Sequence, residues 1–287
     1  MMNAKTAQDK FTAFLKSEDE TISFLRDIVV AVAVVLVILT ALWGYTGQWF
    51  GAPMVAIESG SMMHLDEPFG RIGTIDAGDM VLLVNVDSYD DIITKSEAEE
   101  SEGFYSYGDY GDVIIYRKYG RTDEDQIIHR CMCWVEANED GSFTVDAYDL
   151  FNVQAITIPE LGLSKYKPSH SGYITKGDNP ITNDRSDQAG GICSEPIKLS
   201  WVTGKARGEL PWVGTVNLLF NDIINGAFWN QWVQPTVYNV PQDSMICLVL
   251  LITVLISIPV SMDVYEWYRR KEQRSFPVKD VEHHSKK

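Results

Sequence analysis

The chain has 287 residues, of which 45% are hydrophobic and 22% are charged, and its formal net charge is −16. Residues 51–243 carry 30 acidic and 13 basic side chains, a net charge of −17, so the whole excess lies between two apolar segments. This balance argues against nucleic acid as a partner, because phosphate binding needs a basic surface. It agrees with a domain kept soluble by charge, as in a salty medium.

The first apolar segment is predicted to be a transmembrane helix over residues 27–50. Its apolar block runs from Ile28 to Trp43 and is interrupted only by Thr40, which is long enough to span the hydrocarbon with some tilt. We do not expect a cleaved signal peptide, because no small-x-small site follows closely. A second transmembrane helix is predicted over residues 244–262.

Basic residues predict how the chain crosses the membrane. Lysine and arginine occur in the N-terminal tail, residues 1–26, and in the C-terminal tail, residues 263–287, but none lies between Gly208 and Asp243. Because basic residues stay on the cytoplasmic side, both tails are expected to be cytoplasmic. The sequence therefore predicts a multi-pass protein of the cell membrane with an extracytoplasmic domain over residues 51–243.

Short β-branched or apolar runs, separated by Gly/Asp turns, predict a mainly β domain. The predicted strands are Met80–Val86, Val113–Tyr119, Ile127–Val135 and Ser142–Ala147. Insertions are expected near 87–110 and 148–171. The first contains an acidic Gly/Tyr/Ser-rich stretch, Ser96–Tyr110, predicted as a surface loop, and Pro159 and Pro168 predict irregular backbone in the second.

The segment 217–233 mixes aliphatic residues with Phe220, Phe228, Trp229 and Trp232. This pattern is typical of an amphipathic helix or of a segment in contact with membrane lipid, because tryptophan favours the membrane interface. Packing against the second transmembrane helix explains the pattern equally well, so both alternatives stay open.

A Ser59-Gly60-Ser61-Met62 motif follows the first apolar segment closely, and five further motifs follow it in order. They are Gly78–Val84, Gly111–Tyr116, Ile127–Arg130, Ile174–Asn179 with Asn183-Asp184, and Val202–Gly208. This ordered set resembles type I signal peptidase in its archaeal and endoplasmic-reticulum form. The resemblance covers roughly Val55 to Gly214 and implies a signal-peptidase-type β catalytic domain between the two transmembrane helices.

The resemblance implies Ser61 as the nucleophile and His129 as its general base. A serine hydroxyl needs such a base, because it is a poor nucleophile until its proton is removed. Bacterial members carry lysine at the position of His129, which places this chain with the archaeal type. His64 is the rival base, but three residues from the nucleophile it would need an unusual turn.

The third member of the triad falls on Asp184 by the same resemblance, with the role of orienting His129 and stabilising its cation. Asp178 is expected to order its loop or support the site, and its assignment as the triad carboxylate is the alternative. The Ser59 hydroxyl and the Ser61 N–H are the implied oxyanion donors. No metal or cofactor is implied.

Two features lie outside the family pattern. The longer segment after Ser61, continuing through Gly70 to Asp76, is expected to remodel one wall near the site. Cys131 and Cys133 alternate on a predicted strand, so they read as buried apolar residues or as partners for a bridge to Cys193.

The resemblance implies a membrane-bound serine endopeptidase that removes signal peptides from exported preproteins and selects small residues before the cut. One alternative is a self-cleaving repressor-type protease, which the two transmembrane helices and the His-Arg motif disfavour. The other is a non-catalytic membrane scaffold of the same fold. Accessory subunits and the range of substrates are not encoded in any recognisable motif.

Overall fold

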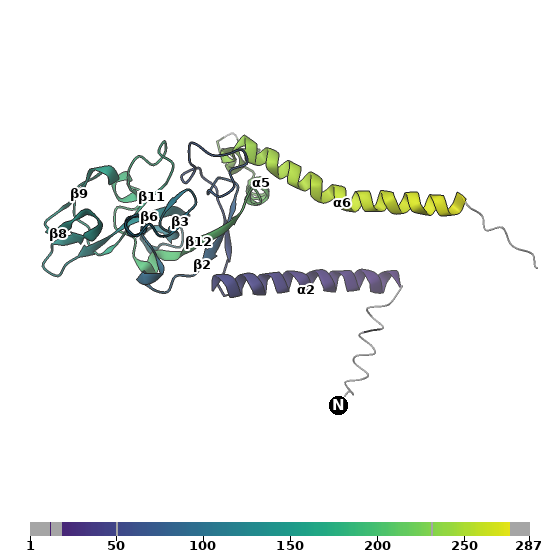
Figure 1. Cartoon of the computed structure of the whole chain (residues 1–287), viewed down its shortest axis with the longest axis horizontal. Helices are drawn as coiled ribbons and strands as arrows, with labels where there is room; N and C mark the ends of the chain where they lie inside the picture. Colours follow the sequence, from purple (N-terminus) through teal and green to yellow (C-terminus); the bar gives the residue numbers. More distant parts are fainter. Residues whose placement is uncertain (1–11, 13–18, 50, 231, 276–287) are drawn as a thin grey trace, which may run out of the picture.

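The computed structural model describes residue 12 and residues 19–49, 51–230 and 232–275 of the chain. It is a mainly antiparallel β domain with one long apolar helix before it and another after it (Figure 1). Most of the predicted N-terminal tail, 1–26, lies outside the described residues. Residues 276–287 of the predicted C-terminal tail, 263–287, also lie outside them.

The first long helix, α2, spans Glu20–Thr46, so it begins and ends earlier than the predicted 27–50. Asp19 caps its N-terminus by accepting the N–H groups of Thr21 and Ile22, and Gly47 ends it in the left-handed conformation at φ 70°.

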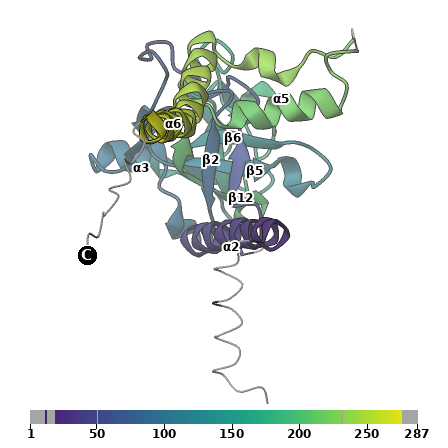
Figure 2. The same cartoon turned by 90° about the vertical axis from the view of Figure 1, so that its right-hand side faces the viewer.

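The second long helix, α6, spans Gln242–Ser275 and bends midway (Figure 1). Pro259 lies inside it and accounts for the bend, since proline removes a helical hydrogen bond. Both helices are long and apolar enough to cross a membrane, and both leave the same end of the domain (Figures 1 and 2).

The main sheet has the strand order β1-β2-β12-β5-β6-β7-β8, and β11 also pairs with β6. Its strands are β1 Met54–Ala56, β2 Met80–Val84, β5 Val113–Arg117, β6 Gln126–Ala137, β7 Phe143–Val145, β8 Leu150–Val153, β11 Gly172–Lys176 and β12 Val202–Leu210. All four predicted strands are present, with β6 longer at both ends than expected. β1 forms one edge of the sheet, and it leads into the Ser59-Gly60-Ser61 motif.

The first insertion is more regular than a surface loop. It contains the 3₁₀ turn η1 Tyr89–Asp91, the helix α3 Lys95–Glu100 and a small hairpin of β3 Tyr105–Ser106 and β4 Asp109–Tyr110. Thr94 and Glu97 form a capping box that starts α3, and Ala98 anchors the helix in the interior.

The prediction of irregular backbone over 148–171 is wrong for most of that segment. It contains β8, β9 Ile156–Ile158 and β10 Leu163–Tyr166; the 3₁₀ turn η3 Asp146–Tyr148 precedes β8, and η4 Pro159–Leu161 links β9 to β10. The apolar side chains of Ile156, Ile158 and Leu163 are buried in one core with Cys133 and Val145. Pro159 occupies the first position of its turn, where its missing N–H costs nothing.

The remaining short elements either join strands of the sheet or, in the case of α5 and η6, lead from β12 to α6. They are the turn η2 Lys118–Gly120, the helix α4 Asp187–Gly190, the turn η5 Leu199–Trp201, the helix α5 Gly214–Ile224 and the turn η6 Thr236–Asn239. A second core, which includes Ile57 and Met62, lies beneath the nucleophile motif. Cys131, Cys133 and Cys193 are buried and free, so the bridge considered from the sequence is absent.

Candidate active site

Ser61 lies in a turn that two neighbouring loops hold in place. The backbone of Ile57 accepts from the Gly78 N–H at 2.8 Å and donates to the Asp79 carbonyl at 2.9 Å. On the other side, the Asn179 N–H donates to the Ser61 carbonyl at 2.9 Å, and the Asn179 side chain donates to the Gly60 carbonyl at 2.7 Å. These bonds fix the backbone that presents the Ser61 hydroxyl.

Gly177 allows that close approach. A Cβ at this position would lie 2.6 Å from the Ser61 carbonyl oxygen and 2.6 Å from the side chain of Asn183. No side chain fits there without moving the nucleophile turn. The Lys-Gly-Asp-Asn motif therefore contributes a backbone that packs directly beneath Ser61.

His129 is held on β6, where it pairs with Ile114 of β5, and it is 2% exposed. Its Nδ1 lies 2.7 Å and 2.8 Å from the two carboxylate oxygens of Asp187. Because an ionised carboxylate only accepts hydrogen bonds, we assign the proton to Nδ1, which leaves Nε2 with its lone pair. That is the tautomer a general base needs.

Asp187 is the first residue of α4, and Ser186 caps this short helix by accepting the Ala189 N–H. Its carboxylate is 1% exposed and also accepts from the Tyr116 hydroxyl at 2.7 Å and the Thr175 hydroxyl at 2.5 Å. A carboxylate with three donors around it is fixed in position and can fix the His129 ring in turn.

The structure does not bring Asp184 to His129, and the predicted pairing is corrected to Asp187. The Asp184 side chain is 66% exposed and forms its ion pair with Arg185 at 2.8 Å. Asp184 lies three residues before Asp187, on the loop that precedes the Ser186 cap, so its carboxylate faces solvent rather than the sheet.

Asp178 lies beside Arg130 and His64 and does not contact His129. Its carboxylate accepts from Arg130 Nε at 3.0 and 3.1 Å, and the side chains of both residues are buried. Burial alone would raise the pKa of Asp178, but the hydrogen bonds from His64 and Arg130 outweigh it and hold the pKa below the usual range.

Arg130 extends that support to the first insertion. Its guanidinium also donates to the carbonyl groups of Tyr107 at 3.2 Å, Tyr110 at 3.2 Å and Gly111 at 2.9 Å. The buried Arg130–Asp178 pair therefore connects the insertion, β6 and the loop under Ser61.

His64 faces away from the cavity that holds Ser61. Its Nε2 lies 3.0 Å from the Tyr107 carbonyl and 3.5 Å from the Asp178 carboxylate. The hydrogen bond with Asp178 raises the pKa of His64, against the opposing effect of burial. Through these contacts His64 links the first insertion to the loop that carries Asp178, and it does not line the cavity.

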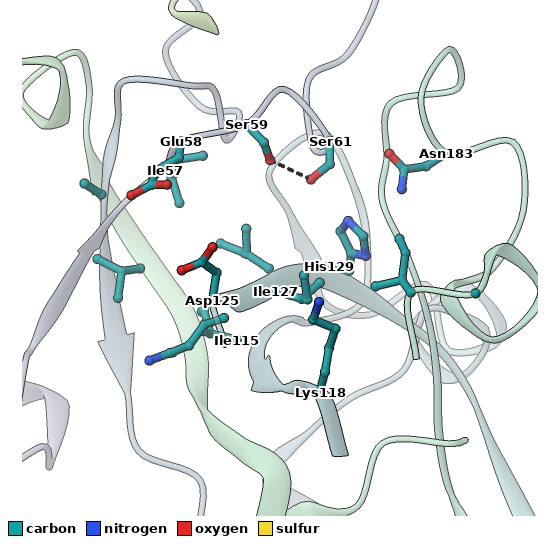
Figure 3. Close-up of a pocket in the computed structure, with 16 residues that line it drawn as sticks. Ile57, Glu58, Ser59, Ser61, Ile115, Lys118, Asp125, Ile127, His129 and Asn183 are labelled. Carbon is teal, nitrogen blue, oxygen red and sulfur yellow. Dashed lines mark hydrogen bonds between the residues drawn. The ribbon is translucent and has the colours of Figure 1, made fainter. Parts of the chain in front are cut away.

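Ser61 and His129 line one cavity of about 630 Å³, together with Ser59 and Asn183 (Figure 3). Figure 3 shows one ring nitrogen of His129 on the side that faces Ser61. No hydrogen bond joins these two residues in the described part of the chain. Such contacts are commonly long without substrate and tighten in the reacting complex.

Two further polar side chains, Ser59 and Asn183, line the cavity with Ser61. The Ser59 hydroxyl donates to the Ser61 hydroxyl oxygen at 3.4 Å. Asn183 is 7% exposed and points its amide into the cavity from the opposite wall (Figure 3). The amide is therefore a further candidate donor to substrate.

The segment after Ser61 does not form a wall of the cavity, contrary to the expectation. The lining comes instead from β1 and residues 57–61, from Ile115 and Ile127 on the sheet, and from Gly191 and Ile192 after α4. The segment is held elsewhere, by an ion pair between Arg71 and Asp243 in the first turn of α6 at 3.2 Å.

Glu58 and Asp125 line the cavity away from His129 (Figure 3). Burial raises the pKa of Glu58, and the neighbouring carboxylates of Asp125 and Asp222 raise it further. Among the described residues, no group of three or more His, Cys, Asp or Glu side chains could hold a metal ion.

The functional contact that the sequence reasoning missed is Asp187, with Tyr116 and Thr175 behind it. The signal for Asp187 was its place after Ser186, because serine followed by aspartate is typical of a helix start that fixes the aspartate backbone.

Comparison of the chain with protein-family models and with curated proteins found no significant match.

Proposed function

We propose that this protein is a membrane-anchored serine endopeptidase that removes signal peptides from exported preproteins. The observation that carries the proposal is the buried Asp187–His129 pair behind the cavity that Ser61 lines. In this reading Ser61 attacks the scissile carbonyl, His129 takes the serine proton, and Asp187 stabilises the imidazolium.

The cavity suits an extended polypeptide. It is open along the edge strand β1, whose free backbone groups can pair with a substrate strand. The Ser59 hydroxyl and the Ser61 N–H would donate to the oxyanion. The apolar floor of Ile115, Ile127 and Ile128 would accept the small side chains expected before the cut.

Two long apolar helices support the choice of membrane-held substrates. They leave the same end of the domain, which would hold the cavity beside the membrane on the outer face (Figure 1). The sidedness is part of the proposal: the first insertion, near Glu102, should be accessible to external protease in intact cells.

The test uses the full chain in detergent with a preprotein that carries a signal peptide. We expect one cut at the signal-peptide boundary, and Ser61→Ala should abolish it while the melting temperature stays unchanged. His129→Ala should be nearly as inactive, whereas the matched variant His64→Ala should retain more activity. If the wild-type chain binds the preprotein and leaves it intact, the non-catalytic scaffold is the better reading.

A further inference from the structure

Residues 210–242, between β12 and α6, are almost without charge in a chain whose net charge is −16. The one charged residue in this stretch is Asp222, which is 5% exposed. Its carboxylate accepts from the Thr236 N–H at 3.0 Å and the Val237 N–H at 2.9 Å. The single charge therefore closes the loop between α5 and η6 from inside and leaves the outer surface neutral.

The outer face of α5 is apolar and uncovered. The residues of this face are between 42% and 65% exposed and are spaced three or four apart: Val216, Leu219, Phe220, Ile223 and Ile224. Leu218 on the inner face is fully buried with Val237 and Val240. The exposed face is not packed against α6, which was the alternative left open by the sequence.

Trp229 and Trp232 follow α5 in the chain and add to its exposed apolar surface. They are 85% and 86% exposed, more than any other large hydrophobic side chain in the described residues. Clustered exposed apolar side chains mark contact surfaces, and tryptophan is enriched where a protein meets lipid headgroups.

The orientation of α5 fits a membrane surface. In Figure 1 the helix is seen nearly end-on while α6 runs across the page, and in Figure 2 the two views are exchanged. The axis of α5 therefore runs across the direction in which α6 leaves the domain, at the end of the domain from which both apolar helices leave. A helix in that position lies parallel to the plane of a membrane that α2 and α6 cross.

We propose that α5, Trp229 and Trp232 form an interfacial platform that lies in the lipid headgroup region beside the two transmembrane helices. The platform is joined to the candidate active site, because the Asn239 side chain donates to the Glu58 carbonyl at 2.8 Å. It would fix the height of the cavity above the hydrocarbon. The platform depends on the membrane spans and not on the proposed peptidase activity.

Fluorescence quenching tests the lipid contact without any activity measurement. The full chain is reconstituted in phosphatidylcholine vesicles, with and without bromine on shallow acyl positions of the lipid. We expect Trp229→Phe with Trp232→Phe to lose a measurable part of the bromine-dependent quenching. The matched control Trp134→Phe, in the aromatic cluster with Tyr89 and Tyr173, should leave it unchanged. Equal quenching in all three proteins would overturn the proposal.

A second measurement distinguishes lipid from another copy of the chain. Phe220→Asp places a charge on the platform, and Asn221→Asp places one on the neighbouring exposed polar position of α5. By light scattering in detergent, we expect the same oligomeric state for the wild type and both variants. A wild-type dimer that only Phe220→Asp dissociates would assign the face to a second copy and overturn the lipid contact.

Discussion

Replacing Asp187 with asparagine tests the carboxylate that the structure places behind His129. The carboxylate accepts three hydrogen bonds, from His129 Nδ1 and from the hydroxyls of Tyr116 and Thr175. An amide keeps one acceptor oxygen but turns an NH₂ group toward at least one of these donors. If that NH₂ faces His129, Nδ1 becomes the acceptor and the proton moves to Nε2, on the side of Ser61.

The expected loss of turnover follows because His129 with its proton on Nε2 cannot take the proton of Ser61. Loss of the orienting carboxylate in a serine triad lowers turnover by about 10⁴. At about 1.4 kcal/mol for each factor of ten, that is about 5.5 kcal/mol on the barrier. A buried donor left without a partner costs a further ~1–3 kcal/mol of folding stability. The Asp187→Asn protein should therefore be far less active. It should still fold, with a lower melting temperature than the wild type.

The assay is the single-turnover rate of preprotein cleavage, with the melting temperature measured on the same samples. The matched control is Asp184→Asn, which removes an exposed carboxylate paired only with Arg185 and should keep wild-type turnover. Asp178→Asn breaks the buried pair with Arg130 and should lower both the rate and the melting temperature. If Asp184→Asn is inactive and Asp187→Asn is active, the assignment of Asp187 as the carboxylate that orients His129 is refuted.

Three further outcomes are expected. Ser59→Ala should slow cleavage by about 10² at unchanged melting temperature, because one oxyanion donor is lost; an unchanged rate would exclude that role. Burial raises the pKa of Asp76 to about 7, of Asp79 to about 6 and of Glu209 to about 7. Their protonation stabilises the fold below about pH 4 and this contribution is lost as pH rises through about 7, so Asp76→Asn should flatten the fall in melting temperature between those values. Gly214→Ala should cost ~1–3 kcal/mol in urea unfolding, since its Cβ would lie 2.3 Å from the Asp79 carbonyl oxygen.

The strands were predictable because each is a short apolar run that buries side chains locally. Val113 to Tyr116 are all buried, and both faces of that strand pack against a core, so the run reads as a strand without its partners. The second insertion was not predictable in the same way. Its strands are three or four residues long, and their stability comes from a core shared with Cys133 and Val145, which only tertiary packing reveals.

The candidate site was also predictable only where its residues lie in local motifs. Ser61 and His129 carry motifs whose local spacing can be recognised, and both line the cavity. Which aspartate lies beside His129 depends on how far the chain continues before α4 begins. Asp187 lies three positions after Asp184, and the cap formed by Ser186 directs Asp187 toward β5 and β11. Motif spacing could point to this part of the chain, but it could not choose between Asp184, which ends the motif, and Asp187, which lies just beyond it.

The segment after Ser61 shows a coupling that no local pattern encodes. Arg71 forms ion pairs with Glu67 at 2.6 Å and Asp76 at 3.2 Å, and with Asp243 of α6 across 172 positions of sequence. Asp243 also accepts from the Gly70 N–H at 3.1 Å, so the first turn of α6 holds both the backbone and the side chain of this segment. The segment that begins at the nucleophile turn is therefore tied to the first turn of α6, and the residues that make this contact are 172 positions apart in the sequence.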